Sequence, residues 1–159
     1  MRTEEQANQA VEEYADLVRR LCFMRLKNRE DSEDVFQTVF LKYLLYDGTF
    51  ESAEHEKAWF IRITINSCKD SLRSVFRRRT LPLEVLSEEA AAVPEEHGAL
   101  LEAVLSLPDH YKDAIYLFYY EGYSAVEIAE ILGRKENTVY TWLSRGRALL
   151  RRRLGGDCL

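Results

Sequence analysis

The stretch SAVEIAEILGRKENTVYTWL, residues 124–143, decides the fold of the C-terminal part of this chain. Ser124 and Glu127 have the spacing of a capping box, in which each side chain accepts a hydrogen bond from the other residue's backbone N–H and so opens a helix. Gly133 supplies a tight turn after that helix. The helix between them carries an apolar stripe formed by Ile128, Ile131 and Leu132.

A second helix is expected from about Glu136 to Arg153, which at 1.5 Å per residue is about 27 Å long. Val139 and Leu143 lie four residues apart and would pack it onto the first helix, where the small side chain of Ala129 permits a close crossing. Such a pair is typical of the helix-turn-helix that docks in the major groove of duplex DNA. A helical hairpin with no role in DNA binding is the alternative.

The second helix would make two kinds of contact with DNA. Side chains at its start would face base edges, namely Lys135, Asn137, Thr138 and Thr141. Arginines further along it are better placed for phosphates, namely Arg145, Arg147 and Arg151 to Arg153.

Charge is distributed unevenly along the chain. The net charge is −5, but residues 62–79 and 134–159 each carry +5, whereas residues 1–61 carry −5 and residues 80–133 carry −10. Each basic segment falls on an expected helix, which favours two separate contacts with a phosphate backbone. A solvated helix face is the ordinary alternative for such a stretch.

Cysteines and histidines give no support to a metal site or an enzyme. The cysteines at 22, 68 and 158 are too far apart for a disulfide framework or a metal-binding pair, so we interpret them as reduced thiols of a cytoplasmic protein. The histidines at 55, 97 and 110 lack ligand spacing, so we expect no metal and no cofactor. Cys68 and His110 could form a thiol–base pair, but no oxyanion motif accompanies them.

No apolar run reaches the roughly 18–20 residues of a membrane-spanning helix, and the polar N-terminus lacks the core of a signal peptide. With 159 residues, 47% of them hydrophobic, the chain suits one ordinary domain or two small ones. Only 7 glycines and 3 prolines interrupt it, so we expect an all-α fold.

Apolar spacing predicts further helices upstream of the quoted stretch, at 7–29, 32–46, 56–79, 99–107 and 108–121. Ser32 is the expected N-cap of the second, Asp47-Gly48 ends it, and Pro108 suits the first turn of the fifth. Residues 80–98 are rich in glutamate and predict an acidic, flexible linker, within which a short helix at 84–92 is the alternative.

The expected helix at 32–46 has two different faces. At 100° per residue, one side carries Phe36, Val39, Phe40 and Tyr43 and suits a core. The other side mixes polar groups with leucines: Asp34, Gln37, Thr38, Leu41 and Leu45. This second face suits a protein partner, and burial of both leucines under a neighbouring helix is an equal alternative.

The expected helix from residue 56 combines aromatic and cationic side chains: Trp59, Phe60, Ile63, Asn66, Lys69, Asp70 and Arg73. Rings beside cations suit single-stranded nucleic acid, because bases stack on the rings and phosphates pair with the cations. Core positions for Trp59 and Phe60, with solvated basic groups, are the alternative.

In this order, the motifs resemble those of the sigma-70 family of RNA polymerase sigma factors, in the extracytoplasmic-function (ECF) group. Residues 34–41 look like that group's D-x-x-Q-x-x-F-L helix, and residues 59–73 look like its W-[LF]-x-x-I-x-x-N-x-x-x-D-x-x-R helix. Leu107-Pro108 and residues 122–147 look like its minus-35-reading domain. The resemblance covers nearly the whole chain.

The resemblance implies two small helical domains and a non-catalytic function. Residues 1–79 would form a region 2-like domain for core polymerase and minus-10 binding, residues 80–98 the linker, and residues 99–159 a region 4-like helix-turn-helix domain. The chain would direct promoter-specific initiation, with core RNA polymerase, promoter DNA and an anti-sigma factor as partners and no small-molecule substrate. A stand-alone helix-turn-helix regulator is the competing interpretation, although it leaves the two N-terminal motifs unexplained.

The resemblance also implies three sets of site residues. Core polymerase would contact Asp34, Gln37, Thr38 and Leu41. Melted minus-10 DNA, with one base flipped into a pocket, would contact Phe50, His55, Trp59, Arg62, Asn66, Lys69, Asp70 and Arg73. Duplex minus-35 DNA would contact Lys135, Glu136, Asn137, Thr138, Thr141, Ser144, Arg145 and Arg147.

The recognition helix departs from the family's frequent T-V-K-S-R-L-x-R-A-R pattern. Tyr140, Thr141, Trp142 and Gly146 stand at its Lys, Ser, Arg and Ala positions. Two cationic positions are therefore aromatic, which indicates a different promoter sequence. Trp142 is equally a candidate core residue.

Overall fold

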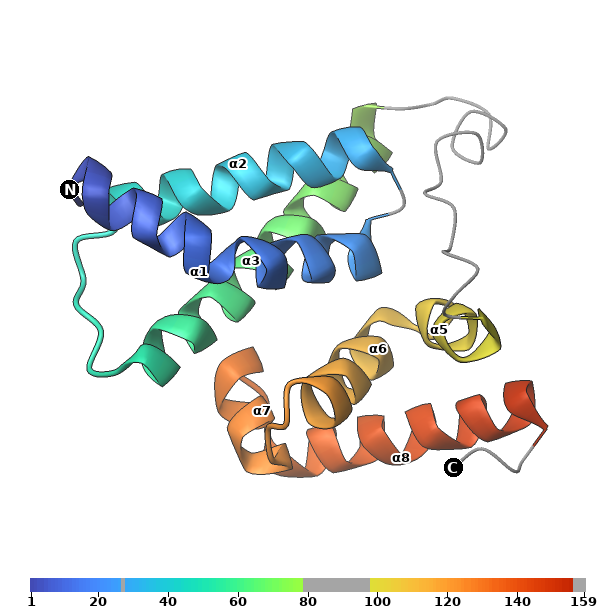
Figure 1. Ribbon diagram of the computed structural model, residues 1–159. Coiled ribbons are helices and arrows are strands. Elements are labelled where there is room, and N and C mark those ends of the chain that lie inside the picture. The colour runs from blue at the N-terminus through green and yellow to red at the C-terminus, as the bar shows by residue number, and fades with distance from the viewer. Residues whose placement is uncertain (27, 79–97, 156–159) are drawn as a thin grey trace. The chain divides into compact units, whose positions relative to one another are not determined.

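The computed structural model describes residues 1–26, 28–78 and 98–155, and of residues 73–78 it describes the backbone alone (Figure 1). Every regular element in these three stretches is a helix, as the sequence predicts. The chain divides into two compact units, whose described parts are residues 1–78 and 98–155. The expected linker falls almost wholly outside the described residues. No described helix is long and apolar enough to cross a membrane.

The first unit, residues 1–78, consists of three helices that pack against one another (Figure 1). They are α1 (Glu4–Arg25), α2 (Arg29–Leu45) and α3 (Ala53–Arg78). The side chains that meet at its centre are fully buried: Val18, Val39, Phe60, Ile61 and Ile65. Cys22 and Cys68 lie in this core as buried, reduced thiols. The burial of Phe60 confirms the core alternative for that ring.

The start of α2 differs from the sequence prediction. Asn28, not Ser32, is the N-cap, because its side-chain oxygen accepts a 2.7 Å hydrogen bond from the backbone N–H of Asp31. The Ser32 hydroxyl instead donates to the Asn28 carbonyl at 3.0 Å. Both residue types are good caps, so composition alone did not decide between them.

The start of α3 also lies earlier than expected, at Ala53 rather than residue 56. Ser52 explains this, because its hydroxyl oxygen accepts a hydrogen bond from the backbone N–H of His55 at 3.1 Å. The Ser52 carbonyl accepts the Glu56 N–H at 3.1 Å and so begins the helical hydrogen-bond ladder.

The second unit, residues 98–155, is organised around its last helix. It contains α5 (Gly98–Leu105), α6 (Asp109–Ile115), the π-helix η2 (Tyr116–Tyr120), α7 (Ala125–Leu132) and α8 (Glu136–Leu154). Helices α5, α6 and α7 each pack against α8 (Figure 1). The largest fully buried side chains among the described residues of this unit are Leu117, Ile128 and Val139.

The expected single helix at 108–121 is wrong in its second half. After α6 the backbone widens into η2, where the Glu121 N–H donates to the Tyr116 carbonyl five residues earlier at 3.2 Å. The Tyr116 hydroxyl also donates to the Glu121 carboxylate at 2.7 Å and fixes the end of this turn. Pro108 is the N-cap of α6 rather than a member of its first turn.

Helix α8 lies close to α6 at Gly146. A Cβ atom at this position would lie 2.9 Å from Cγ1 of Ile115 and 3.5 Å from Cβ of Tyr111. Ile115 is itself buried, so its γ carbon has little room to move. The glycine at the family's alanine position therefore permits a closer crossing of α6 and α8 than a larger side chain allows.

We predict that Gly146→Val lowers the free energy of unfolding of the second unit by about 1–3 kcal/mol, the usual cost of overpacking a core. The matched control is Ala148→Val, because Ala148 is exposed on the same helix. Denaturant unfolding followed by the fluorescence of Trp142, in a background that carries Trp59→Phe, measures both variants. Equal midpoints for the two variants would show that α6 does not restrict this position.

Candidate nucleic-acid and polymerase interfaces

Helices α7 and α8 form the predicted helix-turn-helix. The capping box is present: the Glu127 N–H donates to Oγ of Ser124 at 3.1 Å, and the Ser124 N–H donates to Oε1 of Glu127 at 3.0 Å. Gly133 ends α7 in the left-handed region at φ +66°, where a glycine costs least. Ala129, Val139 and Leu143 are buried between the helices, as predicted.

The predicted base-contacting side chains lie on the surface of α8 opposite its core. Six of the residues predicted for minus-35 DNA are exposed: Lys135, Glu136, Asn137, Thr141, Ser144 and Arg145. Thr138 and Arg147 are half-buried. The Thr141 hydroxyl donates to the Asn137 carbonyl at 3.0 Å, so its oxygen can accept a further hydrogen bond.

The start of α8 borders an open groove of about 410 Å³. Residues of both helices line it: Val126, Ala129, Glu130, Arg134, Lys135, Glu136 and Asn137. No side chain caps the first turn of α8 at its N-cap, Lys135. The N–H groups of that turn and the Lys135 ammonium suit a phosphate oxygen, which the positive end of the helix dipole favours.

Trp142 is neither a fully buried core residue nor a fully exposed one. It is half-buried, and its ring stacks on His110 of α6 at 4.7 Å with 5° between the planes. The Arg134 guanidinium lies 5.9 Å from the same ring. Tyr140, by contrast, is 52% exposed on the first turns of α8. Because His110 stacks on Trp142 and Cys68 is fully buried, the thiol–base alternative has no support.

The first unit carries an aromatic cluster where α2 leads into α3, formed by Tyr43, Tyr46, Phe50, Trp59 and Phe60. The half-buried Trp59 ring meets those of Tyr43, Tyr46 and Phe50 at centroid distances of 5.2–5.9 Å. His55 packs edge-on against Phe50 at 5.5 Å and accepts the Glu51 N–H on Nδ1 at 3.2 Å. Three predicted minus-10 residues thus share one cluster.

Two tyrosines close to Glu56 have a raised pKa. Burial raises the pKa of Tyr43, and a 3.1 Å hydrogen bond to the nearby Glu56 carboxylate raises it further. Burial and Glu56 also raise the pKa of Tyr14, whose ring stacks on Phe60. Both phenols therefore stay hydrogen-bond donors around Glu56 at neutral pH.

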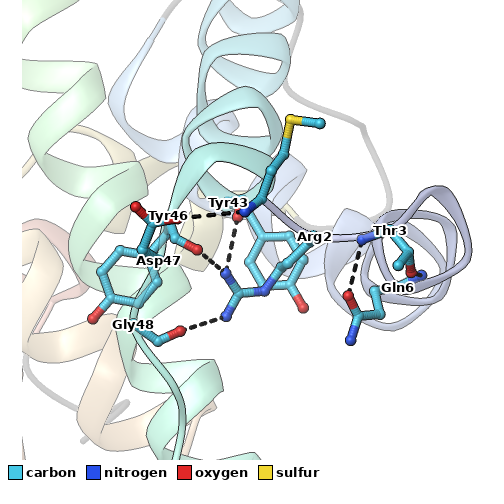
Figure 2. Close-up of polar contacts among 8 residues, drawn as sticks. Arg2, Thr3, Gln6, Tyr43, Tyr46, Asp47 and Gly48 are labelled. Atoms are coloured by element: carbon cyan, nitrogen blue, oxygen red, sulfur yellow. Dashed lines mark hydrogen bonds and ion pairs between the residues drawn. The ribbon is translucent and has the colours of Figure 1, made fainter.

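Sequence reasoning missed Arg2, which closes this cluster from the N-terminal side (Figure 2). Its guanidinium lies 4.4 Å from the Tyr43 ring centroid and donates to backbone carbonyls at the end of α2. A sequence pattern can reveal a cation beside aromatic rings only when the residues are close in sequence. Arg2 is more than 40 residues from these rings, so no local pattern connects them.

One surface of α3 continues from Trp59 with polar groups. Arg62, Asn66 and Asp70 follow at intervals of four residues and are exposed, while Lys69 is half-buried beside them. The spacing of four places these side chains on one helix face. The side chain of Arg73, predicted for the same face, lies outside the described residues.

The mixed face of α2 stays exposed. Asp34, Gln37 and Thr38 are exposed, Leu41 is 55% exposed and Leu45 is 57% exposed. No described helix therefore covers the two leucines. The opposite face buries Val35, Val39 and Tyr43 in the core. This outcome favours a protein partner for the exposed face.

The two units define a helical protein with one DNA-reading helix-turn-helix and a second helical domain. Residues 10–79 match the family described as Sigma-70 region 2, and residues 97–150 match Sigma-70, region 4. The chain is 30% identical to the ECF RNA polymerase sigma factor SigW of Bacillus subtilis, over 91% of this chain and 86% of that protein. It is 36% identical to the RNA polymerase sigma factor SigV of the same organism, over 83% of this chain and 81% of that protein.

Solved structures show the same fold. The sigma factor RpoE of Bartonella quintana, crystallised with the anti-sigma factor NepR, matches with a TM-score of 0.76 at 23% identity, over 94% of this chain and 97% of that one. CnrH, in complex with the cytosolic domain of CnrY, matches with a TM-score of 0.66 at 22% identity, over 98% of this chain and 91% of that one.

The chain belongs to the sigma-70 family, in the ECF group of RNA polymerase sigma factors. It is therefore a transcription initiation factor and not an enzyme: it binds core RNA polymerase and promoter DNA. A stand-alone helix-turn-helix regulator is not supported, because the match includes residues 10–79 as well as the helix-turn-helix.

The capping box makes stability depend on pH in a defined direction. Hydrogen bonds from the Ser124 backbone and hydroxyl lower the pKa of Glu127. Because the folded pKa lies below the unfolded value, Glu127 stabilises the fold above the unfolded pKa, and this contribution is lost as pH falls through the folded pKa.

We predict that Ser124→Ala lowers the free energy of unfolding by about 1 kcal/mol at pH 7, the usual effect of losing a helix cap. Glu127→Gln should be less stable than the unmodified protein at pH 7, and the difference should become smaller as the pH falls through the lowered pKa of the Glu127 carboxyl. Denaturant titrations from pH 3 to 7 measure this. A difference that stays constant over that range would exclude a contribution from the Glu127 charge.

Proposed function

We propose that the chain uses three separate surfaces to start transcription. The exposed face of α2, with Asp34, Gln37, Thr38 and Leu41, would bind core polymerase. The aromatic cluster and the adjoining face of α3 would bind melted minus-10 DNA, and the exposed face of α8 would bind duplex minus-35 DNA. The observation that carries the proposal is the alternation of burial on α2 and α8, whose predicted contact residues face solvent while their other faces form the cores.

The minus-10 surface combines the two contacts that single-stranded DNA requires. Rings at its edge, from Phe50, His55 and Trp59, would stack on or beside a flipped base. Exposed Arg62 and Asn66 would then supply a cation and an amide to the same strand, with Lys69 and Asp70 beside them. Arg73 would extend the surface, as the motif predicts.

The minus-35 surface divides into base and phosphate contacts along α8. Asn137 and Thr141 are exposed at its start and would reach base edges with Lys135, Glu136, Thr138 and Ser144. Arg145 and Arg147 lie further along and would contact phosphates. Arg147 donates to the Tyr119 hydroxyl at 3.2 Å, which orients its guanidinium from η2. Exposed Tyr140 indicates a base preference different from that of relatives with a cation at this position.

The remaining expectations follow from the family. Residues 1–79 would act as the polymerase and minus-10 domain, residues 80–98 as the acidic linker, and residues 99–159 as the minus-35 domain. The protein would act in the cytoplasm, where RNA polymerase is found. An anti-sigma factor would be a further partner, in line with the two matching structures that hold NepR or CnrY.

We predict that adding the protein to core polymerase produces new start sites in run-off transcription and that Leu41→Ala lowers its affinity for core about five- to tenfold. Full burial of a leucine contributes about 1.5–3 kcal/mol, Leu41 has 55% of its surface left to bury, and about 1.4 kcal/mol is tenfold in affinity. The matched control is Leu100→Ala, because Leu100 is 54% exposed on α5, close to the 55% of Leu41. Failure to redirect initiation, or an equal loss with both variants, would contradict the proposal.

We predict that Arg147→Ala weakens holoenzyme binding evenly across minus-35 sequences and flattens the dependence on salt by about one unit per lost phosphate contact. Asn137→Ala should instead change the preference at one base pair by about 1–3 kcal/mol. Affinities for a set of single-base minus-35 variants, measured at several salt concentrations, separate the two. Tyr119→Phe is the control for the Arg147 hydrogen bond. A uniform loss in both alanine variants would contradict the division of α8.

A further inference from the structure

The segment Tyr46–Ser52 joins α2 to α3 without regular secondary structure. It carries Phe50, and it leads directly into His55 and Trp59, so its conformation decides where three of the proposed minus-10 residues lie. A loop of this kind needs anchors outside its own backbone if its rings are to hold one arrangement. Several described contacts of this loop are made with Arg2, near the N-terminus.

Arg2 anchors the backbone at the end of α2 and in the first part of the loop (Figure 2). Its Nη1 donates to the Tyr43 carbonyl at 3.3 Å and to the Tyr46 carbonyl, and its Nη2 donates to the Gly48 carbonyl at 3.0 Å. Its own backbone N–H donates to the Leu44 carbonyl at 3.0 Å. The last carbonyls of a helix lack helical partners and carry the negative end of its dipole, so a guanidinium suits them.

Arg2 also anchors the rings. Its guanidinium lies 4.4 Å from the Tyr43 centroid, 5.1 Å from that of Phe50 and 5.5 Å from that of Tyr46. The side chain is half-buried, which strengthens cation–π attraction relative to an open surface. Phe50 is therefore held between Arg2 and the Trp59 ring, 5.8 Å away.

The position of Arg2 is itself fixed by α1. Thr3 caps that helix in a capping box with Gln6, whose side chain accepts the Thr3 N–H at 2.9 Å (Figure 2). Gly48, whose carbonyl accepts a hydrogen bond from Arg2, has no room for a side chain, because a Cβ there would collide with the Tyr46 ring. The loop backbone therefore fits closely between the guanidinium and that ring.

We propose that Arg2 is a positioning residue for minus-10 recognition. It holds the loop and Phe50 in the arrangement that accepts the flipped base, without contacting the DNA itself. This inference rests on the proposed function, because it needs base capture at the aromatic cluster. Arg2 also lies outside residues 10–79, the stretch that matches Sigma-70 region 2.

The test measures open-complex stability of the holoenzyme with Arg2→Ala on a promoter found by run-off transcription. Each non-template minus-10 position is replaced in turn by an abasic site, and dissociation of the open complex is followed after challenge with heparin. On the intact promoter, Arg2→Ala should shorten the lifetime about tenfold, because several hydrogen bonds and ring contacts are lost. On the template that lacks the captured base, Arg2→Ala should shorten the lifetime by less than about twofold, because the pocket then has no base to bind.

The control variant is Arg19→Ala. Arg19 is also an arginine of the N-terminal segment and lies 4.4 Å from the centroid of the Phe36 ring, but it is on α1 beside α2, away from the loop. It should change lifetimes by less than about twofold on every template, as expected for one exposed cation–π contact. Denaturant unfolding of both variants shows whether each is folded at the assay temperature.

Three results would overturn the inference. An equal loss with Arg2→Ala on intact and abasic templates would show that Arg2 supports the fold or another contact. No loss on the intact promoter would show that the loop needs no anchor. If no abasic site shortens the lifetime with the unmodified protein, the proposed base capture fails, and the role of Arg2 fails with it.

Discussion

The packing of α8 against three other helices is the constraint on which the DNA-reading unit depends. One face of α8 must supply Val139, Leu143, Gly146 and Leu150 to the core, so the opposite face is left for solvent. The close approach at Gly146 fixes α6, and the ring stack of Trp142 on His110 fixes it a second time one turn earlier. The side chains proposed to contact bases are thus oriented by the core beneath them, because burial of one helix face leaves the opposite face in solvent.

The helices of the first unit also have one buried and one exposed face, but their exposed faces include apolar side chains. Helix α2 packs its core face against α1 and α3 and leaves two leucines exposed, an apolar surface that the proposed contact with core polymerase would cover. Helix α3 buries Phe60, Ile61 and Ile65 and exposes Arg62 and Asn66. Because the polar faces of α2 and α3 belong to different helices, a contact with polymerase and a contact with DNA need not compete for the same side chains.

The sequence predicted the helices and their buried faces well wherever the pattern is local. The capping box at Ser124, the glycine turn at Gly133 and the buried pair Val139 and Leu143 depend on neighbours within four residues, and all were confirmed. The helix starts at Arg29 and Ala53 were misplaced by three residues, because several polar side chains in a row can each cap a helix. The π-helix η2 was missed, since nothing in YLFYY distinguishes it from an α-helix by periodicity.

Long-range contacts account for the rest of what the sequence did not predict. Trp142 was left between core and DNA because its partner, His110, lies in another helix, and only packing shows that the two rings stack. Arg2 was overlooked for the same reason: in sequence it is one cation in a polar N-terminus, and in space its guanidinium meets three backbone carbonyls and three rings. A motif identifies the residues that touch a ligand, whereas the residues that hold those in place come from any part of the chain that folding brings near. For the minus-10 surface, that part is the residue directly before the cap of α1.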